Sequence, residues 1–346
     1  MMIWQNFDIW AYHPNSKASF YVLLVNVYPL LPKTEQECPK MSKNQPPGSQ
    51  TNFLPSAVEQ LSEPTSVALA QSIQIEEMIT PLSPQPIRTS YVLQGSGNTP
   101  ILLIHGFDSS VLEFRRLLPL LALTHPTWAV DLLGFGFTER QRDIGYSPAA
   151  IKTHLYHFWK TLIGQPVILL GASMGGAAAI DFALTYPELV QKLILIDSAG
   201  LKGGSALSKL MFPQLYSLAA EFLRNSQVRD RICRSAYKNP SLINDDTLCC
   251  RDLHIEMANW KESLITFTQS GGYQAFKLQQ LGKIGQPTLI LWGDSDRILG
   301  TKDGEKFRQA IPQSQLIWIP DCGHIPHVEK PEITAHHILD FTSKIL

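Results

Sequence analysis

The chain has 346 residues, of which 44% are hydrophobic and 17% are charged, with a formal net charge of −1 and a pI of about 6.8. This composition is typical of a folded protein with a large core and excludes a disordered chain. The near-zero net charge and the lack of a long basic run argue against a nucleic-acid partner.

The cysteines give a second bound on function. Their number is odd and low for the length, which predicts reduced thiols and a cytoplasmic location. No CxxC and no cysteine–histidine spacing typical of zinc occurs, so we predict no metal site. The adjacent pair Cys249-Cys250 is interpreted as an incidental core feature. The cysteines are Cys38, Cys233, Cys249, Cys250 and Cys322.

Residues 1–71 are predicted to be an N-terminal extension that is flexible or partly not native. Its apolar run at 20–31 (FYVLLVNVYPLL) is shorter than the roughly 20 residues that a membrane helix needs, so no stable membrane span is predicted. We favour a start of translation at Met41, with a membrane-proximal anchor at 20–31 as the alternative. Residues 42–66, rich in Ser, Pro, Gln and Asn, are expected to form a flexible or loosely docked lead-in.

A regular pattern begins at about residue 72. Two β-rich segments, 72–80 and 87–95, are separated by prolines and predict an antiparallel pair. Short continuous apolar runs follow, which are typical of strands buried on both faces of a parallel sheet. These runs lie at 101–105, 127–131, 166–171, 192–197, 287–293 and 315–320.

Helical patterns alternate with these runs. The pattern at 147–163 begins with Ser147 as a plausible N-cap and Pro148 in the first turn. Strands that alternate with helices predict the α/β class, with a doubly wound and mostly parallel sheet in a domain over 72–346. The expected helices lie at 113–123, 147–163, 174–187, 302–311 and 331–346.

The alternation stops over residues 201–283, which are mostly helical in pattern. An insertion at the carboxyl end of a strand lies where open α/β sheets bind ligands. We therefore predict a helical lid, and the alternative is a separate small domain without a role in catalysis.

The strongest chemical signal is Gly171-Ala172-Ser173-Met174-Gly175, a G-x-S-x-G between an apolar strand and a helix. That context is the one in which the motif forms a nucleophile elbow. A sharp strand-to-helix turn leaves no room for side chains at Gly171 and Gly175 and exposes the Ser173 hydroxyl. Ser173 is therefore the predicted nucleophile.

The run His105-Gly106-Phe107 follows the strand at 101–105. A backbone N–H at this strand end would point toward the nucleophile, so we expect the N–H groups of Phe107 and Met174 to form an oxyanion hole. The His105 side chain is interpreted as a structural hydrogen-bonding group.

A carboxylate beyond a strand end can orient a histidine, and Asp294, Asp296 and Asp197 all meet this condition. The base follows the last strand in the run Asp321-Cys322-Gly323-His324, which completes the order Ser…Asp…His. His324 is favoured as base over the nearby His327.

With these segments placed, residues 72–346 resemble the α/β-hydrolase family, in the lidded branch that holds C–C bond hydrolases, esterases, epoxide hydrolases and haloalkane dehalogenases. The segments HGFDSS, DLLGFGFTER, GASMGG, WGDSDRIL and CGHIPHVEKP occur in the family's order. The resemblance implies Asp296 as the acid and DLLGFGFTER as a loop at the pocket mouth. Epoxide hydrolases and dehalogenases carry Asp where this chain has Ser173, so these activities are disfavoured.

The resemblance implies a serine hydrolase that cleaves a carboxylic ester of a small, partly apolar substrate, without a cofactor. The alternatives are a meta-cleavage-type C–C bond hydrolase, a hydrolase-like receptor and a scaffold with a dead site. The segment 239–248 is similar to C–C hydrolases. Those enzymes usually carry Asn at the position of Ala172 and Trp at that of Ile325, so the ester is preferred. The oligomeric state is left open.

Overall fold

The computed structural model describes residues 53–202 and 213–344, and its centre is one eight-stranded sheet in the order β1-β2-β4-β3-β5-β6-β7-β8. Strands β1 and β2 are antiparallel, as the sequence predicts, and β2 also pairs antiparallel with β4. The other pairings are parallel. The strands are β1 (Gln74–Met78), β2 (Ile87–Gln94), β3 (Ile101–Ile104), β4 (Thr127–Val130), β5 (Val167–Ala172), β6 (Val190–Ile196), β7 (Thr288–Gly293) and β8 (Ser314–Ile319).

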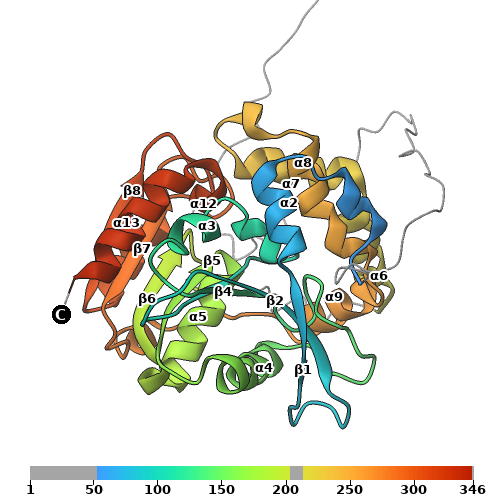
Figure 1. Cartoon of the computed structure of the whole chain (residues 1–346), viewed down its shortest axis with the longest axis horizontal. Helices are drawn as coiled ribbons and strands as arrows, with labels where there is room; N and C mark the ends of the chain where they lie inside the picture. The colour runs from blue at the N-terminus through green and yellow to red at the C-terminus, as the bar shows by residue number, and fades with distance from the viewer. Residues whose placement is uncertain (1–52, 203–212, 345–346) are drawn as a thin grey trace, which may run out of the picture.

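Two apolar layers cover the two faces of this sheet, which confirms the predicted doubly wound fold (Figure 1). Alternate residues of a strand point to opposite faces, so Leu102 of β3 packs in one layer and Leu103 in the other. One layer includes α4 (Pro148–Phe158), α5 (Met174–Thr185) and α11 (Lys302–Ala310). The opposite layer includes α3 (Leu118–Leu121) and α13 (Pro331–Ser343).

The predicted helix at 113–123 is interrupted. The chain forms a 3₁₀ turn, η2 (Val111–Phe114), and then the single turn α3. Pro119 has no N–H to donate and its ring clashes with the carbonyl four residues earlier, so a continuous helix cannot run through it. The helix expected at 147–163 begins at the predicted Ser147 cap and changes to a π-helical turn, η3 (Trp159–Ile163), before Gly164 at φ 65° ends it.

The segment between β6 and β7 is mostly helical, and no strand is found in its described parts, residues 197–202 and 213–287. We call residues 201–283 the helical insertion. Residues 203–212 of the lid prediction lie outside the described ranges. The helices are α6 (Pro213–Arg224), α7 (Ser226–Ala236), η6 (Pro240–Leu242), α8 (Asp245–Asp252), η7 (Leu253–Glu256), α9 (Trp260–Gln269) and α10 (Leu278–Leu281).

Residues 53–71 differ from the flexible lead-in that the sequence suggests. They form η1 (Ser56–Gln60) and α2 (Pro64–Gln71), which lies beside the helical insertion (Figure 1). Leu69 is fully buried, and Asp246 of α8 accepts hydrogen bonds from the backbone of Ser62 and Glu63 and from the Ser66 hydroxyl. The polar composition of the segment did not reveal these contacts, because they depend on partners far away in the chain such as Asp246.

The predictions for Met41 and for the apolar run at 20–31 concern residues outside the described ranges. Among the helices that the structure describes, none combines the length and apolar character that crossing a membrane requires.

Candidate active site

Ser173 stands at the turn between β5 and α5, with a φ of 50° and a ψ of −118°. A residue other than glycine with these backbone angles costs about 1–3 kcal/mol in conformational free energy, so surrounding contacts must hold Ser173 there. Its N–H donates to the Ile196 carbonyl, and its carbonyl accepts from the N–H groups of Gly176 and Ala199. Strand β6, the residues after it and the first turn of α5 therefore hold the backbone of Ser173 in place.

The glycines of this turn are required by close backbone contacts. A Cβ on Gly171 would lie 2.2 Å from the Gly175 carbonyl oxygen, and one on Gly175 would lie 2.1 Å from that of Ile104. Gly176 is a third such position, which the sequence motif does not single out, because its Cβ would meet the Ser198 Oγ at 2.1 Å. The turn can therefore bring β3, β5 and β6 together only with glycine at these positions.

His324 lies in the loop after β8, with its ring between Ser173 and Asp296. The distance from His324 Nε2 to Ser173 Oγ is 2.9 Å, and that from Nδ1 to Asp296 Oδ2 is 3.0 Å. Because an ionised carboxylate can only accept, Nδ1 carries the proton, and Nε2 is then free to accept the serine proton. The structure thus brings together the three residues that the sequence nominates as nucleophile, acid and base.

Asp296 is held as an anion. Its Oδ1 accepts the N–H groups of Ile298 and Leu299, at 2.7 and 3.1 Å. Burial would raise the pKa of Asp296, but His324 and these two N–H groups outweigh burial and lower it. A negative charge at this point favours an imidazolium on His324 when it takes a proton.

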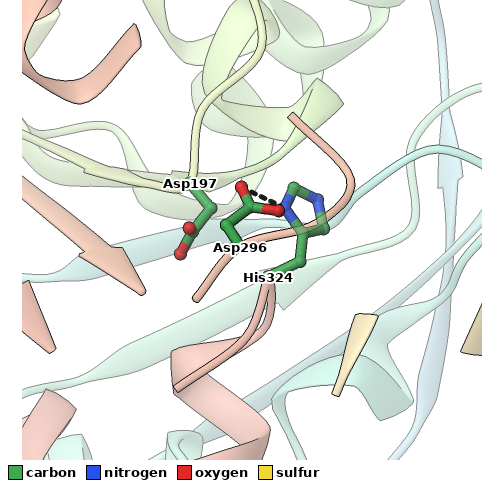
Figure 2. A group of neighbouring side chains, drawn as sticks. All are labelled: Asp197, Asp296 and His324. Atoms are coloured by element: carbon green, nitrogen blue, oxygen red, sulfur yellow. Dashed lines mark hydrogen bonds and ion pairs between the residues drawn. The ribbon is translucent and has the colours of Figure 1, made fainter. Parts of the chain in front are cut away.

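Asp197, the competing acid, lies beside Asp296 rather than against the imidazole (Figure 2). It follows β6 with a φ of 39°, and its carboxyl group accepts the Gly293 N–H at 3.1 Å. Burial and then the neighbouring Asp296 carboxylate raise the pKa of Asp197 well above its ordinary value. Both effects favour the uncharged form of Asp197, so the negative charge of the buried pair is favoured on Asp296.

The remaining competitors have other partners. Asp294 accepts the backbone N–H groups of Asp321 and Cys322, and so braces the loop that carries His324. His327 Nε2 lies 3.0 Å from Glu113 Oε1. His105 is buried and joins its own loop to the loop after β4: Nδ1 lies 2.8 Å from the Gly106 carbonyl, and Nε2 accepts the Leu132 N–H at 3.1 Å.

The predicted oxyanion donors flank the serine. Met174 is the next residue at the start of α5, and a Cβ on Gly106 would lie 3.5 Å from the Ser173 Cβ, so the loop with Phe107 lies against Ser173. Phe107 also packs edge to face against Phe135 and in a tilted arrangement against Phe267, at centroid distances of 5.8 and 6.1 Å. The helical insertion therefore reaches the wall of the site through Phe267.

Two glutamates with little solvent exposure brace these loops, and the sequence motifs did not identify them. Glu113 accepts the Gly106 N–H at 3.0 Å. Glu329 accepts the Gly323 N–H at 2.9 Å and the Asn239 N–H, in the insertion, at 2.6 Å. Glu113 follows the HGF run by a few residues, and Glu329 lies in the CGHIPHVEKP segment, so proximity to motifs was the available signal.

A metal ion does not suit the group of Asp197, Asp296 and His324, although their ligand atoms lie within 4.8 Å of one another. Both ring nitrogens of His324 are already engaged, one by Ser173 and the other by Asp296.

The described cysteines Cys233, Cys249, Cys250 and Cys322 are free thiols, and burial raises the pKa of each. The adjacent pair Cys249-Cys250 is therefore poorly suited to redox exchange.

Residues 99–331 match the family model of the alpha/beta hydrolase fold, which is more than half of the chain. The chain therefore belongs to the α/β-hydrolase family, and its relatives include hydrolases of several kinds. It is 33% identical to the alpha/beta hydrolase domain-containing protein VTE7 of Arabidopsis thaliana, over 84% of this chain and 90% of that protein.

Two further comparisons show the range of the family. The chain is 28% identical to Lipase 1 of Psychrobacter immobilis, over 70% of this chain and 77% of the lipase. The crystal structure of CarC, a serine hydrolase involved in carbazole degradation, superposes with a TM-score of 0.64 at 26% identity, over 78% of this chain and 99% of CarC. This protein is accordingly a hydrolase of the α/β-hydrolase family.

Proposed function

We propose that this protein is a serine hydrolase that cleaves a carboxylic ester of a small, partly apolar substrate through an acyl-enzyme. The observation that carries the proposal is the unbroken contact chain from Ser173 Oγ through His324 to Asp296, at 2.9 and 3.0 Å, on a strained turn. Distances of this size put nucleophile, base and orienting acid within direct hydrogen-bond reach.

In the proposed reaction, His324 Nε2 takes the proton of Ser173 as Oγ bonds to the ester carbonyl carbon. The N–H groups of Phe107 and Met174 stabilise the oxyanion. The imidazolium then gives its proton to the leaving alkoxide as the C–O bond breaks and the acyl-enzyme forms. A water molecule, deprotonated by His324, attacks the acyl carbon and releases the acid with Ser173 protonated again. None of these steps calls for a cofactor.

The apolar part of the substrate is proposed to lie against the aromatic side chains that join the Phe107 loop to the insertion. Phe135 and Phe267 pack edge to face at 5.2 Å, and Tyr273 packs on Phe267 at 6.4 Å. Apolar rings next to the acyl position favour an alkyl or aryl group over a charged one. We propose that the helical insertion serves as a lid over this surface, in a protein that acts in the cytoplasm.

Labelling with a fluorophosphonate, followed by a panel of esters of increasing acyl length, tests the proposal. We expect Ser173→Ala to abolish both labelling and hydrolysis. Ser314→Ala serves as the control, because Ser314 begins β8 at the opposite end of the sheet. Full ester hydrolysis by Ser173→Ala would refute the assignment.

The same panel separates the alternatives. A meta-cleavage product tests C–C bond hydrolysis. The segment 239–248 favours this activity, whereas Ala172 and Ile325 argue against it. A receptor would bind such compounds, with a rise in melting temperature, and release no product. Turnover of an ester by the wild type would decide for the enzyme.

A further inference from the structure

Asp108 is the point at which the helical insertion joins the loop of Phe107. Its Oδ1 accepts the indole N–H of Trp260 at 2.8 Å and lies 3.0 Å from His254 Nε2. Its Oδ2 accepts Arg229 Nη1 at 2.6 Å. The three donors come from α9, η7 and α7, so separate parts of the insertion converge on one carboxylate beside a predicted oxyanion donor.

The Asp108 carboxylate is buried and charged. Burial would raise the pKa of Asp108, but His254 and Arg229 outweigh burial and hold it well below its ordinary value. The side chains of Asp108 and Arg229 are only 9% and 6% exposed, so neither charge could lose its partner without a large cost in free energy. Arg229 is held from the other side by Asp252 at 2.6 Å.

The backbone of the same loop is constrained on both sides of Phe107. Asp108 has a φ of 48°, in the left-handed region that few residues adopt without support. On the other side, Glu113 accepts the Gly106 N–H at 3.0 Å. The two carboxylates therefore constrain the backbone on either side of Phe107, and among the described contacts it is that of Asp108 which the helical insertion binds.

We propose that Asp108 is a positioning residue that couples docking of the helical insertion to the geometry of the oxyanion hole. The inference rests on the proposed function, because it concerns the N–H of Phe107 as a donor to the reaction. With Trp260, His254 and Arg229 in place, the loop holds that N–H toward Ser173. When these contacts are broken, the loop loses its support from the insertion and the N–H turns away.

The expected effect is on kcat rather than on KM. An oxyanion donor stabilises charge that develops only in the transition state, and removing one costs on the order of 10²–10³-fold in kcat in a well-studied protease. Misdirecting a donor costs part of that. A lid contact that only bound substrate would instead raise KM and leave kcat unchanged.

Asp108→Asn is the first test. Asparagine keeps the size and tolerates a positive φ, but it replaces one accepting oxygen by an NH₂ group and removes the charge that Arg229 needs. We expect kcat and the rate of fluorophosphonate labelling to fall at least about 10-fold, with KM within about 3-fold of the wild type. Unchanged kcat and labelling in a folded Asp108→Asn protein would overturn the proposal, whatever its melting temperature.

Trp260→Phe is the milder companion, and it serves alone should Asp108→Asn fail to fold. It removes the indole N–H and keeps an aromatic ring, and we expect a loss of roughly 3–10-fold in kcat. Because Trp260 would act through Asp108, the double variant should be no slower than Asp108→Asn alone. Independent, multiplied losses would show that no such coupling exists.

Glu221→Gln is the matched control. It breaks another ion pair of the insertion, between α6 and α9, with Lys261 Nζ at 2.6 Å, and no hydrogen bond or ion pair among the described residues links that pair to Arg229 or Asp108. We expect wild-type kcat from it, and a fall equal to that of Trp260→Phe would count against the proposal. Should the wild type label with fluorophosphonate yet hydrolyse no ester, the proposed function fails, and the labelling rates of these variants still decide the coupling.

Discussion

Asp197 and Asp296 show how two identical side chains that lie side by side differ in their tendency to ionise. Both are buried, and a second negative charge beside the first is unfavourable, so the contacts of His324, Ile298 and Leu299 favour the negative charge on Asp296. The pKa of Asp197 is raised, and its carboxyl group accepts the Gly293 N–H.

This difference predicts unequal effects of the same substitution. Asp296→Asn removes the charge and the acceptor that orient His324, and we expect kcat to fall by roughly 10³–10⁴-fold, as for an orienting Asp elsewhere. Asp197→Asn replaces an acid whose raised pKa favours the uncharged form by a neutral amide of the same shape, so kcat should stay within about 10-fold of the wild type. Steady-state ester kinetics on the two folded variants measure this, and equal losses would mean that the charge is shared.

The glycines of the Ser173 turn allow a test by a single methyl group. Gly171→Ala would place a Cβ 2.2 Å from the Gly175 carbonyl oxygen, against backbone that cannot move aside. We expect the variant to be insoluble or to lose fluorophosphonate labelling. Gly285→Ala, with no atom within 4 Å of its Cβ, is the control and should label as the wild type does. Normal labelling of Gly171→Ala would contradict the close approach of these segments.

At the scale of elements, α2 is stabilised by tertiary contacts rather than by its own sequence. No side chain caps the N-terminus of this short helix, and Leu69 packs in the same apolar layer as α3 and α13. A buried leucine replaced by alanine costs about 2–5 kcal/mol in the free energy of unfolding.

We therefore expect Leu69→Ala to lower the free energy of unfolding by about 2–5 kcal/mol, measured by urea denaturation. Leu123→Ala is the matched control, because Leu123 is 78% exposed, and it should change stability by less than about 0.5 kcal/mol. Equal, small effects would mean that α2 is not part of the cooperative unit.

The free energy of unfolding of the whole protein should decrease at acid pH, because carboxylates with little solvent exposure become protonated. Burial would raise the pKa of Glu113, but its hydrogen bond with His327 and its electrostatic interactions with His327 and His105 lower it from 4.5 to about 2. A carboxylate with a lowered folded pKa contributes stability above its unfolded pKa, and this contribution is lost as the pH falls through the folded value.

The free energy of unfolding should accordingly fall between about pH 4.5 and about pH 2. Glu113→Gln should be less stable than the wild type at neutral pH and lose less stability over that interval. Glu332→Gln, at an exposed position of α13, should behave as the wild type does. Chemical denaturation at a series of pH values gives both slopes, and identical slopes for wild type and Glu113→Gln would contradict the prediction.

The sequence by itself determined the alternation of buried strands and helices and the place of Ser173, because strand runs and the glycine turn are local patterns of residue type. It also placed His324 and its candidate acids beyond strand ends, without choosing among the acids by residue pattern alone. Resemblance to a family, rather than periodicity, favoured Asp296 over Asp197 and Asp294.

The tertiary structure was needed to show which of these carboxylates contacts the imidazole. It also showed that residues 53–71 pack beside the insertion and that Asp108, Glu113 and Glu329 brace the loops of the site. These features depend on contacts between segments far apart in the chain, such as Asp108 with Arg229. A local pattern reports the conformation of its own segment, whereas the burial and charge of a side chain are set by whatever the fold places around it.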